Sequence, residues 1–268
     1  SAKLPWVGYF NAQEFNRAAW QSHTSKVHIG GQEINVDGAI VAVWPKDHLQ
    51  IAQLWVPKAP VLIEKPIVMP AELDQLEQLV AVYPNRIFAA DCFLDSDALR
   101  WVLKNKTLLE DIGDLVAVNG RLVESNPIEI GREWLLDPAV SGGGLGMDIL
   151  PHPLALTHHL LQQIGMNKPI LVQQATLARY ITESNESKLG EGETYMHING
   201  QIGAVNLSLE GGKGVDAVYY GITLEGSKGT LEIMNGTDVH LPYVQVVSED
   251  GSTNVYTFRQ NLYCHHQM

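Results

Sequence analysis

The stretch SGGGLGMDILPH, residues 141–152, brings together residue types that could do acid–base chemistry. Asp148 and His152 stand four residues apart, so on a helix they would share one face. A carboxylate beside an imidazole can orient the ring and tune its proton affinity, which suits general acid or base catalysis. A helix N-terminal cap would explain Asp148 but would leave His152 without a role. We therefore interpret the two residues as an acid/base pair.

The glycines before this pair do not form a dinucleotide-binding loop. That fingerprint is G-x-G-x-x-G between a strand and a helix. Gly144 and Gly146 would require a glycine at position 149, where Ile149 stands, and the residues before them are not strand-like. The cluster is either a flexible turn or a loop that lets the backbone approach a ligand closely. We expect the second, with the glycines bringing the loop close to a substrate.

A lysine earlier in the chain offers a second group for the same chemistry. Lys65 follows the apolar run 61–64 and precedes Pro66. A lysine at a strand end is either simply solvated or, when partly desolvated, able to hydrogen-bond or protonate a reacting oxygen. A metal site is not expected, because His158 and His159 have no i, i+4 relation to His152 and the tail CHHQM lacks a second ligand group.

Parallel βαβ units could position these residues. Short apolar runs at 37–45, 59–68 and 86–92 are typical of buried parallel strands, and helical spacing at 46–56 and 71–83 separates them. In the second helix, Leu73, Leu76, Leu79 and Val80 are in register for one apolar face. Upstream, a strand at 4–11 and a helix at 12–21 continue the alternation. Ligands of such sheets bind at the carboxyl ends of the strands, here WPKDH and IEKP.

The second part of the sequence has a different pattern. A helix is expected at 97–105 and a strand at 113–125. From about residue 170, alternating stretches are separated by turn signals such as GSKG at 226–229, and they predict a meander of antiparallel strands. The fold class is therefore an α/β Rossmann-like parallel sheet in residues 1–91, followed by an α+β domain with a large open antiparallel sheet in residues 92–268.

Composition excludes several classes of function. The formal net charge of −12 argues against nucleic acid as a partner. No apolar run reaches the roughly 18 residues that a membrane span needs. The chain shows no charged-then-apolar segment of the kind that begins a secretory signal, so we expect no secretory leader. The two cysteines, Cys92 and Cys264, lie far apart, which is typical of a reducing cytoplasm. We expect a cytoplasmic protein without a membrane partner.

Three stretches taken together resemble the glucose–fructose oxidoreductase / inositol dehydrogenase / MocA family of NAD(P)-dependent oxidoreductases. These are DGAIVAVWPKDH, VLIEKPIV and W…DP…SGGGLGMDILPH. The E-K-P hallmark is Glu64-Lys65-Pro66, and the G-G-G-x-x-x-D-x-x-x-H hallmark runs from Gly142 to His152. ITLEGSKGTLEI resembles the late sheet motif of the family. The match spans roughly residues 1–260, and the order and spacing of the two hallmarks make it specific.

The resemblance implies a reaction and a set of site residues. His152 would take a hydroxyl proton while hydride leaves the same carbon for NAD or NADP, Lys65 would stabilise the developing oxygen, and Asp148 would orient the substrate or the base. Substrates would be sugars, sugar derivatives or cyclic polyols, and the open sheet would pack subunits into a homo-oligomer. The implied cofactor-binding residues are Asn11, Pro45, His48, Glu64 and Lys65.

Two features depart from the family pattern. The chain opens with a segment that matches the second strand, so the parallel sheet is expected to lack its first strand and the glycine fingerprint, and the chain ends before the family's closing helix. A sheet without its first strand would expose a pairing edge and lose the helix N-terminus that holds pyrophosphate, so we expect omitted segments rather than a reduced protein. Asn11, near the ribose position, does not select between NAD and NADP.

A non-catalytic alternative is a sensor of the same fold that binds a dinucleotide or a sugar and regulates a partner. The missing glycine loop favours it. The joint presence of Lys65, Asp148 and His152 favours the enzyme, because a sensor has no need for all three.

Overall fold

The computed structural model describes most of the chain from Lys26 onward. The described ranges are 26–29, 32–35, 37–125, 132–180, 191–215, 217–236 and 241–259. The strand expected at 4–11, the helix expected at 12–21 and Asn11 lie outside them. A hairpin of β1 (Lys26–Ile29) and β2 (Gln32–Asn35), which the sequence did not indicate, precedes the parallel sheet.

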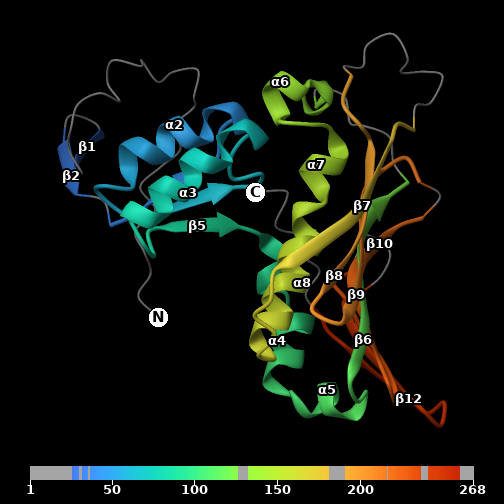
Figure 1. The fold of residues 1–268 in the computed structure, drawn as a ribbon. Helices are drawn as coiled ribbons and strands as arrows, with labels where there is room; N and C mark the ends of the chain where they lie inside the picture. The colour runs from blue at the N-terminus through green and yellow to red at the C-terminus, as the bar shows by residue number, and fades with distance from the viewer. Residues whose placement is uncertain are drawn as a thin grey trace.

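The predicted parallel βαβ units are confirmed. In the described part of the chain, β3 (Ala39–Val41), β4 (Val61–Glu64) and β5 (Ile87–Ala90) form a three-stranded parallel sheet in that order. The connections are α2 (Pro45–Trp55), then η1 (Pro70–Glu72) with α3 (Leu73–Val82). Val41, Val61 and Ile63 pack against Ala52 of α2 and against Val56, which follows it, to form the core of this part. Figure 1 shows α2 and α3 beside the strands of this sheet.

The expected burial of these strands on both faces is wrong for the described residues. Right-handed crossovers between strands in sequential order place both helices on the same face of the sheet. Val41 and Ile63 point to that face, whereas Ile40 is 75% exposed and Phe88 is 49% exposed on the other. Leu73 and Val80 of α3 are exposed as well, so the apolar face predicted for this helix is only partly covered.

The second part of the chain begins with helices and continues into a large sheet. Before the first strand of that sheet lie η2 (Cys92–Asp95), α4 (Asp97–Lys104) and α5 (Thr107–Asp111). After β6 (Leu115–Glu124) come η3 (Glu133–Leu136), α6 (Pro138–Ser141), α7 (Leu145–Ile149) and α8 (Pro151–Gln163). The remaining strands are β7 (Ile170–Ala178), β8 (Tyr195–Ile202), β9 (Val205–Lys213), β10 (Tyr219–Gly226), β11 (Gly229–Met234), β12 (Tyr243–Ser248) and β13 (Thr253–Thr257).

The large sheet is open and mostly antiparallel, as predicted, but it is not a simple meander. Among the described residues its order is β13-β12-β11-β10-β6-β9-β8-β7, and β6 runs parallel to β9. Helices rather than a hairpin follow β6, so the chain re-enters the sheet at its far edge, and β9 and β10 later close on either side of β6. The turn predicted at 226–229 does join β10 to β11.

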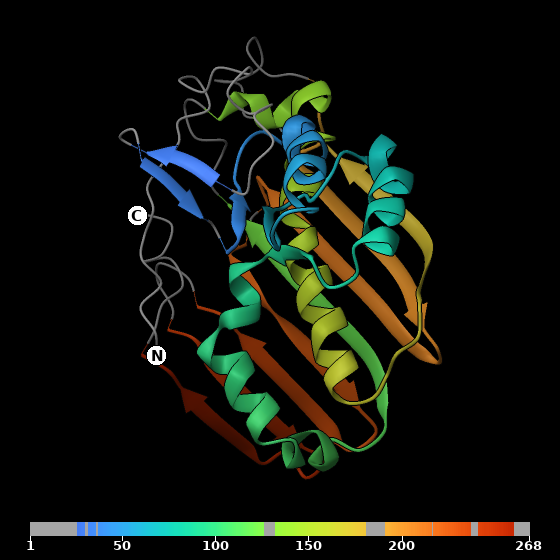
Figure 2. The same ribbon diagram turned by 90° about the vertical axis from the view of Figure 1, so that its left-hand side faces the viewer.

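Helices cover one face of the large sheet. Figures 1 and 2 show α4, α5 and α8 on the face that is turned toward the parallel sheet, with α7 and α8 between the two sheets. The main core lies beneath them and joins Leu99 of α4 and Leu160 of α8 to Leu209, Ile222 and Leu231 of the sheet. None of the described helices has the length and apolar composition that a membrane span requires.

Candidate active site

Lys65 joins the parallel sheet to the second part of the chain. It directly follows β4, and its Nζ donates to Oδ1 of Asp148 at 2.8 Å and to the backbone carbonyl of Asp148 at 2.9 Å. The two side chains are 20% and 13% exposed, so the ion pair is partly desolvated. An ammonium group has three protons, and these two bonds leave one for an oxygen of a ligand. An Nη of Arg132 lies 4.0 Å from the other Asp148 oxygen.

The structure pairs Asp148 and His152 differently from the expectation. They lie on separate helices, because α7 ends at Ile149 and α8 begins at Pro151. Nδ1 of His152 lies 3.0 Å from Oδ1 of Asp91, at ion-pair distance but without the alignment of a hydrogen bond. Two pairs, Lys65 with Asp148 and His152 with Asp91, thus replace the single predicted pair.

Asp91 is the site residue that sequence reasoning missed. It directly follows β5, so it lies at the same sheet edge as Lys65, and this position was a signal that could have identified it. Its side chain is 4% exposed, and Oδ1 also accepts from the backbone N–H of Phe93 at 3.0 Å. The Phe93 ring meets the His152 ring edge-on, with 4.9 Å between centroids. Asp91 and Phe93 therefore hold the imidazole from two sides.

The predicted cofactor residues at this edge have mainly structural contacts. His48 is fully buried, and its Nδ1 and Nε2 lie 2.8 and 3.0 Å from the backbone oxygens of Pro66 and Val43. Pro45 is buried in the first turn of α2, and Glu64 accepts from the backbone N–H of Lys65 at 3.2 Å. His48 thus ties the Lys65–Pro66 segment to the turn after β3, and its ring has no exposed surface for a ligand.

The glycines make room for the chain itself. A Cβ on Gly144 would collide with the carbonyl oxygen of Glu193, and one on Gly146 would lie 2.9 Å from the backbone nitrogen of Met196. Oε1 of Glu193 accepts from the backbone N–H groups of Gly144 and Met147, at 2.8 and 2.9 Å, and so holds the first turn of α7. This close packing of two backbone segments accounts for the glycines at 144 and 146. It does so without the close approach of the loop to a substrate that we expected from the sequence.

Two tryptophans face one another near this edge, one from each part of the chain. Trp44, at the start of α2, stacks on Trp134 of η3 with 6.4 Å between ring centroids and 23° between planes. Nζ of Lys46 lies 4.9 Å from the Trp44 ring centroid, within cation–π range. The stack joins the parallel sheet part to the segment that leads into α7.

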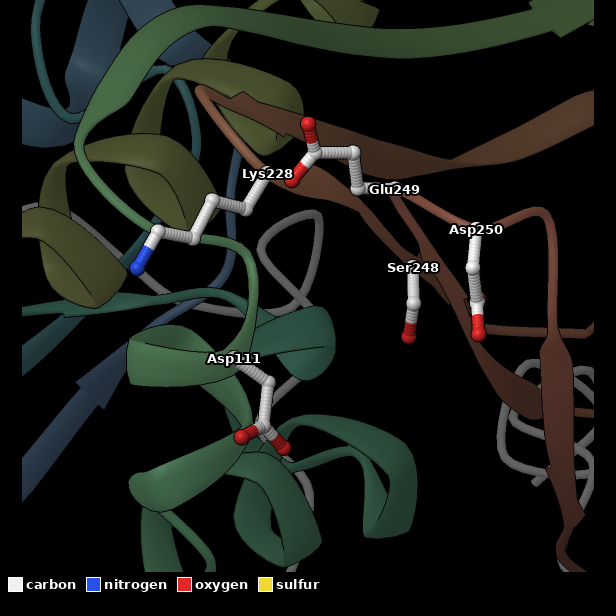
Figure 3. A pocket seen from close by; sticks show the side chains of 5 residues that line it. All are labelled: Asp111, Lys228, Ser248, Glu249 and Asp250. Carbon is white, nitrogen blue, oxygen red and sulfur yellow. The ribbon is translucent and has the colours of Figure 1, made fainter.

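One surface hollow among the described residues lies far from these groups. It measures about 400 Å³ and is lined by Asp111, Lys228, Ser248, Glu249 and Asp250. Figure 3 shows that the Lys228 amine points away from the two acids of the 248–250 turn, so the side chains do not converge on one point. Its open, mixed-charge surface offers no paired acid and base, and we place the candidate site at Lys65 and His152 instead.

Solved structures share the fold of this chain, whereas no protein-family model and no curated protein matches its sequence. Aldose-aldose oxidoreductase from Caulobacter crescentus, complexed with glycerol, superposes with a TM-score of 0.68 at 16% identity, covering 86% of this chain and 67% of that one. An inositol dehydrogenase homolog from Azotobacter vinelandii, complexed with NAD⁺, gives 0.64 at 16% identity, with 83% and 57% covered. Levoglucosan dehydrogenase, complexed with NADH and levoglucosan, gives 0.67 at 14%, with 84% and 61% covered.

The chain therefore spans between 57% and 67% of the length of these three structures. Identities this low establish a shared fold. The chain has the Rossmann-like fold of oxidoreductases of the glucose–fructose oxidoreductase / inositol dehydrogenase / MocA type.

Proposed function

We propose that this chain is part of an NAD(P)-dependent oxidoreductase that moves hydride between a nicotinamide and a hydroxyl-bearing carbon of a sugar, sugar derivative or cyclic polyol. Residues 1–91 would serve the nucleotide and residues 92–268 the substrate. The observation that carries the proposal is the pairing of Lys65 with Asp148 and of His152 with Asp91 at the carboxyl edge of β4 and β5. Glycerol, levoglucosan, NAD⁺ and NADH in structures of the same fold support it.

The residues at this edge fit the reactive end of a nicotinamide nucleotide. Lys65 offers a proton to an oxygen, and His152, held by a carboxylate, can exchange one. Within the described residues the turn from β3 to α2 is AVWP, which lacks the glycines of a pyrophosphate loop. Because Lys65 and His152 supply reactive groups and this turn has no pyrophosphate loop, Lys65 would border the nicotinamide end of the nucleotide. The role of the nicotinamide when bound is to accept or donate the hydride.

The proposed division of work follows from the contacts. Asp91 faces Nδ1 of His152, which leaves Nε2 to take the proton from the substrate hydroxyl. Asp148 engages two of the Lys65 protons and fixes the ammonium, whose remaining proton would bind the same oxygen as its charge grows. The hydroxyl proton would end on His152, and a bound nicotinamide would supply the acceptor for the hydride, so that the alcohol would be oxidised to a carbonyl.

The first test is a titration of the chain with NADH and with NADPH, followed by tryptophan quenching, and then a turnover screen with sugars and polyols. Lys65→Met and His152→Gln should each lower turnover by about 10²- to 10⁴-fold while nucleotide binding persists. Lys228→Met, far from the site, is the matched control and should keep full turnover. Binding without turnover of any substrate would favour the sensor, and absence of binding would refute the proposal for this chain.

A further inference from the structure

A small, partly open cavity lies beside the His152 side chain, between α8 and strands β6 and β10. It measures about 10 Å³, which is room for about one water molecule. Phe93 and Tyr220 form part of its wall, and the polar side chains of His152 and Asn235 also reach it. His152 itself is buried, with 7% of its surface exposed.

Two residues that line this cavity each have a buried polar atom without a hydrogen-bond partner in the described structure. These atoms are Nδ1 of His152 and Oδ1 of Asn235. Asn235 is 1% exposed, and its backbone N–H donates to the backbone carbonyl of Tyr220 at 2.8 Å, which fixes the residue at the end of β11. Burying a polar atom unpaired costs about 1–3 kcal/mol, so a polar partner for each is strongly favoured.

We propose that this cavity holds one ordered water that bridges Asn235 to the imidazole of His152. The water would donate one proton to Oδ1 of Asn235 and would accept from the N–H at Nδ1 of His152. Asn235 then acts as a positioning residue, because it fixes the ring whose other nitrogen faces the substrate. This positioning role rests on the function proposed above, whereas the water bridge itself does not.

The bridge accounts for the misaligned contact with Asp91. With the Asp91 carboxylate at 3.0 Å as its only acceptor, the N–H at Nδ1 of His152 would align with the carboxylate oxygen. The Phe93 ring, which meets the imidazole edge-on, restrains the imidazole in its present orientation. A water on the cavity side gives the same N–H a second acceptor, as is common for three-centre hydrogen bonds. Asp91 and the water would together set the orientation and tautomer of the ring.

The test compares Asn235→Leu, which removes the acceptor, with Asn235→Asp, which keeps an oxygen in the same place. The full chain is labelled with ¹⁵N-histidine, and the His152 ring signals are assigned by their loss in His152→Gln. We expect Asn235→Leu to shift these signals and to lower kcat by up to about 100-fold with little change in KM. Asn235→Asp should restore both toward the unaltered values, and a crystal structure should show one water between the two side chains.

Thr157→Val is the matched control, because Oγ1 of Thr157 is also buried without a partner on α8 but does not line the cavity. It should leave the His152 signals unchanged. Unshifted signals in Asn235→Leu, or a cavity without water density in the crystal, would overturn the bridge. If the unaltered chain turns over substrate, a normal kcat in Asn235→Leu would overturn the positioning role. Lack of turnover in the unaltered chain would refute the proposed function. The His152 ring signals would still test the water bridge in that case.

Discussion

At the scale of single residues, the candidate site is built on carboxylates that hold a lysine and a histidine. Asp91 is almost completely buried against His152, and Asp148 is nearly as buried against Lys65. Each carboxylate has a second contact, with the backbone of Phe93 or with Arg132. Lys65 and His152 are therefore both held by carboxylates of the protein itself.

Asp91→Asn tests the support of His152. The amide keeps an oxygen for the Phe93 N–H but loses the negative charge beside the imidazole. We expect kcat for the proposed oxidation to fall by on the order of 100-fold, since the ring loses both orientation and charge compensation. Steady-state kinetics at several pH values measures this. Asp97→Asn, in the first turn of α4, is the control, and an equal loss there would mean a general structural effect.

Cys92 offers a pH-dependent prediction at the same place. Burial, and then the negative charge of Asp91, raise the pKa of the Cys92 thiol to about 11. At pH 8 the thiolate fraction should be roughly 100-fold lower than for an ordinary cysteine, and alkylation correspondingly slower. In a Cys264→Ser background, iodoacetamide labelling followed by mass spectrometry should rise about tenfold per pH unit up to about pH 10. Rapid labelling at pH 8 would contradict the burial of this thiol.

Sequence reasoning reached about half of this site for a physical reason. Lys65 is recognisable because it ends a buried strand, and Asp148 and His152 because their spacing is conspicuous. Their partners are set by how separate segments meet in space. Asp91 and His152 are in contact although they lie 61 positions apart in the sequence, so no local sequence pattern could indicate this contact. Asn235 is more distant still.

At the scale of elements, the glycine-rich segment shows how tightly the start of α7 is packed. Gly144→Ala should destabilise the chain by at least about 2 kcal/mol, because its Cβ would collide with the backbone of Glu193. The matched control is Gly38→Ala, where the nearest atom would be 3.5 Å from the new Cβ, an ordinary contact. Urea unfolding followed by circular dichroism compares the two. Equal stability of both variants would mean that the Glu193 segment moves aside freely.

Elements with local signals were predictable, and those set by distant pairing were not. Helical spacing and turn residues located α2, α3 and the β10–β11 hairpin. The place of β6 between β9 and β10 has no such signal, because its neighbours lie about ninety to about one hundred and ten residues later. Alternation reveals that β6 is a strand, but it does not reveal which strands lie beside it.

At the scale of the whole molecule, the edge of the large sheet offers a surface for self-association. Leu171, Val172 and Leu177 of the edge strand β7 are more than half exposed. We expect homo-oligomers, and Leu177→Arg should raise their dissociation constant by at least about 10-fold through loss of apolar contact. Sedimentation velocity measures the mass. Val82→Arg, on α3 and similarly exposed, should not change it, and a monomeric unaltered chain would refute the expectation.

The central place of β6 also has a consequence for how the chain folds. Val118 pairs with Leu207 on one side and with Leu224 on the other, so this strand has neither neighbour until most of the chain has been synthesised. Such long loops must close before pairing gains any free energy, which slows folding. Until then β6 has only nearby helices, chiefly α8, to shield its apolar face. The nascent chain therefore passes through a long interval in which its future sheet centre is accessible to chaperones and to other strands.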